Sequence, residues 1–567
     1  MRFAEALKLA RDVGSREQPT FNVSLVSAST PLSLITFTQA FLGRNDYQRS
    51  FKVSAAPYGD LVESVRRALT SDADAIAIVI EYYALDPRLG LRRVSSWTDS
   101  ALADVLIGVE QKLASILHLL TNTKHKRTVL HPPALPLPPI TGQGSWQLSK
   151  FHASLAEIIA RFNNAACDVP GIIIASPSIN LAKEPRNADG ETAADFPYTQ
   201  ESAAFIGETI AHCIRPPAPL KGIITDLDDT FWRGLVGEVG PEGVHWNLDG
   251  KSQMHAVYQQ LLAALASRGI LVAVASKNDN AVVTAALERD DLLISRDSIF
   301  PVIANWDPKS KAVEQILARW NVGADSVVFV DDNRYELEEV SRSFPTMETR
   351  HFPTTDANAV YNLLNELRDL CHKEKTNEED VLRLQSIRAS AEIAVLAQET
   401  SLDDFLSGIG ASIKLEKANA SDTRALELVN KTNQFNLNGR RWSDSEWSRY
   451  LEDDSREVVS ISYSDKFGAL GKIGVIMCRR DKDELEIEQW VLSCRAFARR
   501  IEHATLKSIC GVWRPRAIRF DYQKTEKNSP IAEFLATLSL ADNKVSEPEL
   551  LQSLPEIYAS IEERINN

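Results

Sequence analysis

The strongest chemical signal in the sequence is a group of polar residues that follows a short apolar run. The segment KGIITDLDDTFWRG places Asp226, Asp228 and Thr230 directly after the apolar residues 222–225. Ligands of a parallel sheet bind at the carboxyl ends of its strands, so we expect these side chains to face a ligand. Carboxylates at such a place can attack an electrophile, exchange protons or hold a hard divalent cation.

Three further segments follow in the same chain order. Ser276 ends the apolar run LVAVAS and is followed by Asn278, Lys309 lies in NWDPKSKAV at a predicted helix start, and Asp331 and Asp332 close the run SVVFVDDN. Each segment taken alone is equally well explained as an ordinary turn, cap or surface residue. Four of them in order, each at a strand end or a helix start, favour a single catalytic site.

These residue types match the needs of phosphoryl transfer, which requires an in-line nucleophile and positive charge around the equatorial oxygens. We expect Asp226 to be the nucleophile that forms an aspartyl phosphate, and Asp228 to be the general acid and then the general base. Asp226, the backbone carbonyl of Asp228, and Asp331 would hold Mg²⁺. Lys309 would also restrain Asp226. The residues expected to bind the phosphoryl group or cofactor are Thr230, Ser276, Asn278 and Lys309.

The four motifs together resemble those of the haloacid-dehalogenase (HAD) superfamily, and the resemblance implies a Mg²⁺-dependent catalytic domain between Lys221 and Pro345. Between Asp226 and Ser276 lie 49 residues, and between Ser276 and Lys309 lie 32. Both intervals are too short for an inserted cap domain. The site is therefore expected to be open to large substrates or covered by a neighbouring domain.

The surrounding chain predicts further α/β domains. Residues 1–215 alternate β-branched runs with amphipathic stretches, which predicts a parallel sheet covered by helices. The prolines of IRPPAPLKG, residues 214–222, favour a domain boundary because they prevent a helix from continuing. Residues 216–372 are predicted to form the HAD-like domain without a cap. Residues 373–400 are predicted to form a charged helical connector, and residues 401–567 an α+β domain.

Composition excludes several classes of protein. The 567 residues are 44% hydrophobic and 25% charged, which is typical of globular domains rather than disorder. A net charge of -14 argues against nucleic-acid binding through phosphate neutralisation. The six cysteines form no CxxC pair, which favours a reducing cytoplasm over a disulfide framework or zinc site. No apolar run reaches the roughly 20 residues of a membrane span, and the N-terminus lacks a signal-peptide pattern.

The string DLDDTFWRGLVGEVGPEGV resembles the FkbH-like subgroup of the HAD superfamily, subfamily IIIC. The segments LVNKTNQFNLNGRRW and LEIEQWVLSCRAFARRIEHATL are similar to the acetyltransferase-like (GNAT) domain of that family, and the N-terminal region resembles its SGNH-hydrolase-like domain. The resemblance implies an enzyme that dephosphorylates an acyl phosphate such as 1,3-bisphosphoglycerate. The glyceryl or acyl group would pass to the phosphopantetheine arm of an acyl carrier protein, in secondary-metabolite or surface-polysaccharide biosynthesis.

The sequence departs from this family at the position of a cysteine. Glyceryl-loading members read CSKN at the second motif, whereas this chain has Ala275 there. Cys494 is then the other candidate nucleophile, although a lone cysteine is more often a small buried hydrophobic residue. The GNAT pattern has an arginine followed by two glycines that bind the phosphates of CoA. After Arg495 this chain has Ala498 and Arg500 in place of those glycines, so CoA is not expected to bind in the usual mode.

Two other features keep alternatives open. Five arginines could form a basic patch for an acidic carrier protein, or they could form only a solvated helix face. These arginines are Arg440, Arg441, Arg495, Arg499 and Arg500. Ser27, Ala28 and Ser29 stand where an SGNH hydrolase has its GDS nucleophile, and no late DxxH follows, so we expect a non-catalytic scaffold or lid. The alternatives to acyl transfer are a plain HAD-type phosphatase and a non-catalytic assembly factor.

Overall fold

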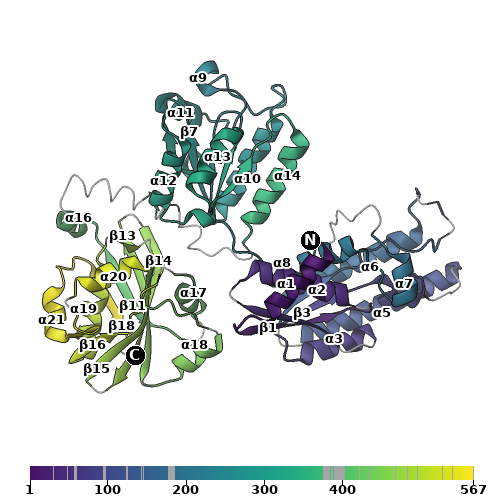
Figure 1. The fold of residues 1–567 in the computed structure, drawn as a ribbon, viewed down its shortest axis with the longest axis horizontal. Helices are drawn as coiled ribbons and strands as arrows, with labels where there is room; N and C mark the ends of the chain where they lie inside the picture. Colours follow the sequence, from purple (N-terminus) through teal and green to yellow (C-terminus); the bar gives the residue numbers. More distant parts are fainter. Residues whose placement is uncertain are drawn as a thin grey trace. The chain divides into compact units, whose positions relative to one another are not determined.

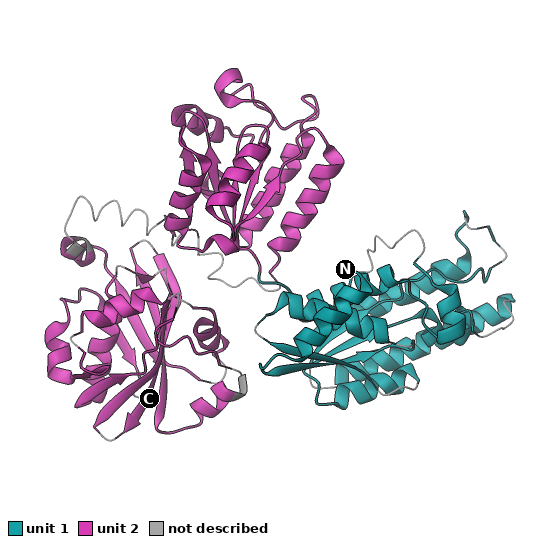
Figure 2. Ribbon diagram, in the orientation of Figure 1, with its two compact units in different colours: residues 1–218 teal, residues 219–567 magenta. Residues whose placement is uncertain are grey.

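A computed structural model gives the fold of the chain, which divides into two compact units, residues 1–218 and 219–567 (Figure 2). The junction lies in the proline-containing segment 214–222. The structure describes residues 1–565 except for 30, 48, 57–59, 93–97, 123–125, 142, 145, 177–184, 374–383, 385–386, 389–401, 420–421, 433, 443, 467, 482, 494–495, 498, 526–527 and 539.

The first unit contains a five-stranded parallel sheet with the order β2-β1-β3-β4-β5 (Figure 1). Its strands are β1 (Thr20–Val26), β2 (Ser50–Ala55), β3 (Ala75–Val79), β4 (Arg127–His131) and β5 (Ile172–Ile174). Its helices are α1 (Phe3–Gly14), α2 (Leu32–Asn45), α3 (Leu61–Thr70), α4 (Tyr82–Leu85), η1 (Pro87–Leu89), α5 (Asp99–Asn122), α6 (Lys150–Cys167), α7 (Ala188–Ala194) and α8 (Gln200–Ile214). The predicted parallel sheet is confirmed.

Helices cover both faces of this sheet because alternate residues of a strand point to opposite sides. Ala75, Ala77 and Val79 of β3 pack in a cluster with α1, α2 and α8. Ile76 and Ile78 pack in a second cluster with α3, α5 and α6. The continuous apolar run of β3 is therefore the pattern of a strand that is buried on both faces.

One strand of the first unit, β4, was not predicted from the sequence. β4 ends at His131, the first residue of the proline-rich segment 131–140, and pairs in parallel with β3 and β5. Its apolar part is only two residues long, Val129 and Leu130, and the prolines that follow dominate the local pattern. The remaining proline-rich residues form turns and irregular structure.

The second unit begins with a second parallel sheet, in the order β10-β9-β6-β7-β8. Its strands are β6 (Gly222–Thr225), β7 (Leu271–Ser276), β8 (Ile299–Ala304), β9 (Val327–Asp331) and β10 (Glu348–His351). The helices are α9 (Val236–Val239), α10 (Gln253–Ser267), α11 (Asn280–Leu287), η2 (Arg296–Ser298), α12 (Lys309–Trp320), η3 (Ala324–Ser326), α13 (Arg334–Ser343) and α14 (Ala357–Leu370).

Both faces of this sheet are covered as well (Figure 1). Ile223 and Val272 pack in a cluster with α10 and α14, whereas Ile224 and Ala273 pack in a cluster with α12. The strands β6, β7 and β9 are buried along their whole length. Within residues 219–373, which are all described, the intervals between the motifs hold only α9, α10, α11, η2 and strands of this sheet. No domain is inserted there.

The C-terminal part of the second unit is built on an eight-stranded mixed sheet, in the order β17-β16-β15-β14-β13-β11-β18 with β12 paired to β15. The strands are β11 (Ser412–Lys417), β12 (Phe435–Asn436), β13 (Arg456–Asp465), β14 (Gly468–Asp481), β15 (Glu484–Leu492), β16 (Ala517–Phe520), β17 (Lys544–Ser546) and β18 (Ser560–Arg564). The helices are α16 (Leu402–Gly408), α17 (Thr423–Lys431), α18 (Asp444–Leu451), α19 (Ile501–Trp513), α20 (Ser529–Ala536) and α21 (Glu547–Ser553).

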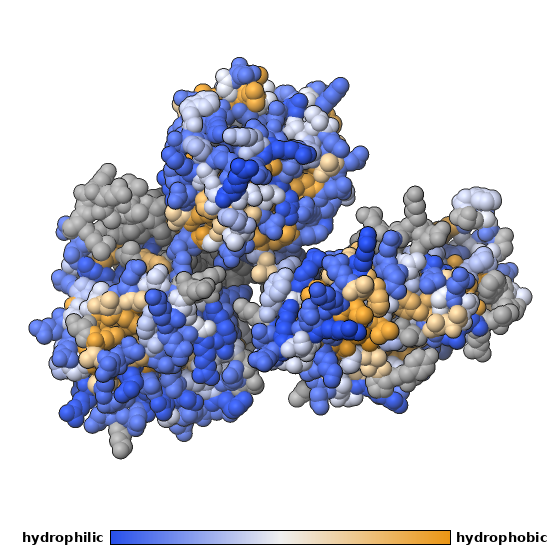
Figure 3. Space-filling view, in the orientation of Figure 1, coloured by the Kyte–Doolittle hydropathy of each residue, from blue (hydrophilic) through white to orange (hydrophobic). Residues whose placement is uncertain are grey.

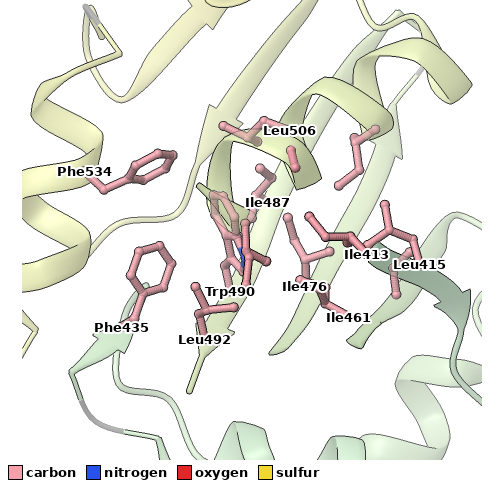
Figure 4. Packing of buried hydrophobic residues seen from close by; sticks show 14 of the residues in the cluster. Ile413, Leu415, Phe435, Ile461, Ile476, Ile487, Trp490, Leu492, Leu506 and Phe534 are labelled. Atoms are coloured by element: carbon pink, nitrogen blue, oxygen red, sulfur yellow. The ribbon is translucent and has the colours of Figure 1, made fainter. Parts of the chain in front are cut away.

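The core of this C-terminal part lies between the sheet and its helices. Figure 4 shows Trp490 of β15 facing Phe435 and Phe534, with the aliphatic side chains of neighbouring strands beside them. The Trp490 ring meets Phe435 and Phe534 edge-on, with 5.5 Å between centroids in both pairs. The predicted connector, residues 373–400, lies almost wholly outside the described residues.

The surfaces visible in Figure 3 are mainly hydrophilic, with smaller apolar patches between charged regions. Among the described residues, no helix combines the length and the apolar composition that crossing a membrane requires. No disulfide joins any of the five described cysteines, which are Cys167, Cys213, Cys371, Cys478 and Cys510.

Replacement by alanine should have opposite effects on stability at two helical glycines of the first unit, Gly207 of α8 and Gly108 of α5. A Cβ at Gly207 of α8 would lie 2.7 Å from the Cβ of Phe37 and 2.9 Å from the backbone nitrogen of Thr38. Gly207→Ala should therefore destabilise this unit by about 1–3 kcal/mol. Gly108→Ala in α5 should stabilise it by about 0.5–1 kcal/mol, because its Cβ would meet only Asp86 Oδ2 at 3.7 Å. Urea unfolding measures both, and equal shifts would contradict the close helix contact.

Candidate active site

The four sequence motifs meet at the carboxyl end of the second parallel sheet. The strand order reverses between β6 and β9, and their register places Thr225 opposite Val330. Asp226 follows β6 and Asp331 ends β9, so the two carboxylates lie side by side at the point where such sheets bind ligands. Ser276 ends the neighbouring strand β7.

Lys309, the first residue of α12, holds these carboxylates together. Its ammonium nitrogen lies 2.5 Å from Asp226 Oδ1, 3.0 Å from Asp331 Oδ2 and 3.0 Å from Glu336 Oε2. The Lys309 side chain is only 2% exposed. A buried ammonium is tolerated here because carboxylates surround it, so the predicted restraint of Asp226 by Lys309 is present in the geometry.

The protonation equilibria of the cluster reflect burial first and neighbouring charges second. Burial raises the pKa of Asp226, although Lys309 opposes this effect. Burial and the adjacent Asp226 carboxylate raise the pKa of Asp331 to about 8. The same two causes raise the pKa of Asp332 to about 6. Burial would lower the pKa of Lys309, but the surrounding carboxylates outweigh it and hold that pKa above its ordinary value.

A divalent cation fits this donor set. One carboxylate oxygen from each of Asp226, Asp331 and Asp332 lies within 4.8 Å of the others. Hard cations such as Mg²⁺ prefer oxygen ligands and bind through a few carboxylates plus water and substrate oxygens. Three carboxylates meet here, and the contacts of the Lys309 ammonium group reach only two of them, Asp226 and Asp331. Asp332 thus joins the predicted ligands Asp226 and Asp331 as a side chain that could hold the metal.

The side chain of Asp228 is held firmly beside this cluster. Its Oδ1 accepts hydrogen bonds from Trp232 Nε1 at 2.9 Å and from the backbone N–H of Val236 at 3.0 Å. Its Oδ2 accepts from Asn278 Nδ2 at 2.9 Å. Asn278 also donates to Ser276 Oγ at 3.0 Å, so these three predicted site residues form one network. These hydrogen bonds fix the orientation of Asp228, the predicted general acid and base.

Thr230 closes the loop after β6. Its hydroxyl accepts a hydrogen bond from the backbone N–H of Asp332 at 3.0 Å, and its carbonyl lies 2.9 Å from His255 Nδ1. Thr230 is fully buried. The structure therefore gives Thr230 a role in joining the loops after β6 and β9.

Sequence analysis missed Glu336, which belongs to the same cluster. Glu336 lies in the first turn of α13, next to the helix cap formed by Asn333. It bridges Lys309 at 3.0 Å and Lys277 at 3.1 Å. Burial opposes ionisation, but both lysines hold the pKa of Glu336 below its ordinary value. The sequence holds no signal that separates Glu336 from Glu338 and Glu339 of the same helix.

The candidate nucleophile Cys494 lies outside the described residues, as do Arg495 and Ala498 of the GNAT-like segment. The structure therefore describes no contact of the Cys494 thiol. Ala275, which stands where the resembling family has a cysteine, is fully buried in β7.

The structure corrects the interpretation of two predicted surface arginines. Arg499 is buried, and its Nε lies 3.5 Å from Asp465 Oδ2. Arg500 pairs with Asp403 at 2.6 Å. Arg499 therefore belongs neither to a basic patch nor to a solvated helix face, because it forms a buried ion pair with Asp465 inside the domain. The arginines of the set that are exposed in the described residues are Arg440 and Arg441.

Comparison with known proteins supports the fold. No family model matches the chain, and no curated protein does. The chain is similar to the solved N-terminal part of a Bacteroides fragilis protein that contains a phosphatase domain, in complex with Mg. The TM-score is 0.51 at 21% identity, and the match covers 65% of this chain and 98% of that chain.

Two other solved structures are too dissimilar to support an argument. A putative phosphosugar isomerase from Bacillus subtilis has a TM-score of 0.12 at 10% identity, with 68% of this chain and 93% of that chain covered. A fungal GCN5-related glucosamine N-acetyltransferase region has a TM-score of 0.15 at 8% identity, with 93% and 64% covered. The likeness to the Bacteroides fragilis structure therefore shows a shared α/β fold, in agreement with the predicted HAD-like parallel sheet.

Proposed function

We propose that residues 221–345 form a Mg²⁺-dependent HAD-type phosphatase or phosphotransferase site. The observation that carries this proposal is the buried cluster in which Lys309 bridges Asp226 and Asp331 at the β6/β9 switch point. Asp332 adds a third carboxylate to the same place. The likeness to a phosphatase-containing protein solved with Mg supports the same chemistry.

The geometry supports a two-step reaction. A carboxylate oxygen of Asp226 would attack phosphorus, and the bond from phosphorus to the leaving oxygen would break as Asp228 gives that oxygen a proton. Asp228 would then take a proton from the water that hydrolyses the aspartyl phosphate. Bound Mg²⁺ would neutralise charge on the phosphoryl oxygens and the carboxylates. Lys309 would hold Asp226 in place, while Trp232 and Asn278 orient Asp228.

The finer part of the proposal is the fate of the acyl group. The resemblance of the flanking segments favours dephosphorylation of an acyl phosphate and transfer of the glyceryl or acyl group to an acyl carrier protein. A cytoplasmic biosynthetic pathway for secondary metabolites or surface polysaccharides belongs to this finer proposal. Hydrolysis without transfer is the second candidate, favoured by Ala275. The intact charge cluster disfavours a non-catalytic assembly factor.

Replacement of the proposed nucleophile tests the central claim. Asp226→Asn should lower phosphate release from a small aryl phosphate or acyl phosphate by at least about 10³-fold, because a neutral amide cannot attack phosphorus. The matched control is Asp297→Asn, whose side chain is 90% exposed, and it should retain full activity. Circular dichroism checks that both variants are folded. Appreciable turnover by folded Asp226→Asn would remove Asp226 from this role.

Removal of the metal is the second test. EDTA should abolish phosphate release, and added Mg²⁺ should restore it, because Asp226, Asp331 and Asp332 would carry uncompensated charge against the phosphoryl group. Isothermal titration of the chelated protein with Mg²⁺ should show binding that Asp331→Asn weakens. Full activity in excess EDTA would contradict the proposed site.

The transfer proposal depends on Cys494. If a thioester forms on the protein, Cys494→Ser should abolish protein acylation and transfer to a carrier, yet leave phosphate release from a small aryl phosphate unchanged. If Cys494 only packs, the same change should lower stability by about 1 kcal/mol and affect no chemistry. Intact-protein mass spectrometry after exposure to the acyl phosphate distinguishes these outcomes. A wild-type protein without a hydroxylamine-cleavable adduct would leave hydrolysis as the function.

A further inference from the structure

A second lysine lies beside the acidic cluster of the candidate active site. Lys277 follows Ser276, the last residue of β7, and precedes Asn278. Both neighbours belong to the polar network around Asp228. The ammonium nitrogen of Lys277 lies 3.1 Å from Glu336 Oε1. The Lys277 side chain is 32% exposed, so its ammonium group stays accessible to an incoming ligand.

One carboxylate separates this ammonium group from that of Lys309. Glu336 Oε1 meets Lys277, and Glu336 Oε2 lies 3.0 Å from the ammonium nitrogen of Lys309. Glu336 lies in the first turn of α13, and its side chain is only 12% exposed. A lysine side chain has a flexible four-carbon stem. Glu336 therefore holds the Lys277 ammonium group beside the cluster that contains Asp226 and Asp331.

The two lysines differ in the hydrogen-bond donors that remain for a ligand. An ammonium group has three N–H donors. The nitrogen of Lys309 contacts three carboxylates, those of Asp226, Asp331 and Glu336, and the side chain is almost completely buried. Among the described residues, Lys277 forms an ion pair with one carboxylate, that of Glu336. Lys277 therefore has donors to offer to a ligand, whereas Lys309 would first have to release a carboxylate.

A phosphoryl group that enters this site meets several carboxyl groups. Oxygens of Asp226, Asp331 and Asp332 lie within 4.8 Å of one another, and Glu336 adds a fourth carboxyl group through its contact with Lys309. Transfer of a phosphoryl group requires positive charge around its equatorial oxygens. The accessible ammonium group of Lys277 can supply part of this charge in addition to a bound divalent cation.

We propose that Lys277 binds the phosphoryl group of the substrate, while Lys309 holds the carboxylates of the cluster together. The contact is a charge-assisted hydrogen bond to a phosphoryl oxygen, and Glu336 positions the ammonium group that makes it. This assignment rests on the proposed phosphatase or phosphotransferase function of the same site. It divides between two lysines the roles that the sequence analysis gave to Lys309 alone.

Isothermal titration of the full chain with inorganic phosphate, in the presence of Mg²⁺, tests the role of Lys277. Lys277→Met removes the charge but keeps a long side chain, and it should raise the dissociation constant of phosphate about 5- to 30-fold. Lys277→Arg keeps the positive charge and should bind phosphate within about 3-fold of the wild type. The matched control is Lys311→Met, because Lys311 is exposed on α12, and it should bind phosphate as the wild type does.

Titration of the phosphate-free proteins with Mg²⁺ separates phosphoryl binding from a structural role. Lys277→Met should bind Mg²⁺ at least as tightly as the wild type, because every carboxylate of the cluster remains. Circular dichroism checks that each variant is folded. The proposal is overturned if phosphate does not bind the wild-type protein, if Lys277→Met binds phosphate as tightly as Lys311→Met, or if its Mg²⁺ affinity falls as much as its phosphate affinity. Failure of this assignment leaves phosphate release by the wild type intact, whereas failure of the proposed function abolishes it.

Discussion

The second unit depends on the placement of one buried ammonium group among carboxylates that would otherwise repel one another. Lys309 is 2% exposed, and Asp331, one of its partners, is fully buried. Loss of one partner from a buried ion pair destabilises a protein by about 3–5 kcal/mol, because the remaining charge is uncompensated. The loop after β6, the strand β9 and the helices α12 and α13 each contribute a residue to this cluster. Their ends are consequently fixed relative to one another before any ligand binds.

The two parallel sheets of the chain use their switch points in different ways. At β6/β9 the carboxylates outnumber the ammonium group of Lys309, and this excess of negative charge suits a divalent cation. At β1/β3 the buried Glu81 carboxyl group accepts hydrogen bonds from the Ser27 hydroxyl and from the backbone N–H of Ala28. The same strand topology therefore holds different polar groups at its two switch points, and the loops determine which groups these are.

The meeting of Asp226, Lys309 and Asp331 at one edge of the sheet could be predicted from the sequence, because β6 and β9 are buried on both faces and are followed or ended by these carboxylates. The sequence could not identify Glu336, since the helix segment RYELEEV contains three glutamates and only the tertiary structure selects the one that meets Lys309. Arg499 was misjudged for a related reason. An arginine between charged and small residues normally lies on a surface, and its burial depends on the distant partner Asp465.

The location of position 275 in the fold indicates whether any residue there, alanine or cysteine, could take part in acyl transfer. Adjacent residues of a strand point to opposite faces. Ser276 joins the polar network of Asn278, whereas Ala275 packs in the apolar cluster with Ile224 and Val313 and is fully buried. A cysteine thiol at position 275 would be enclosed in that cluster, away from the polar network. In this fold the absence of cysteine there removes no group from the network around Asp226 and Asp228, and a thioester on this chain would have to form on another residue.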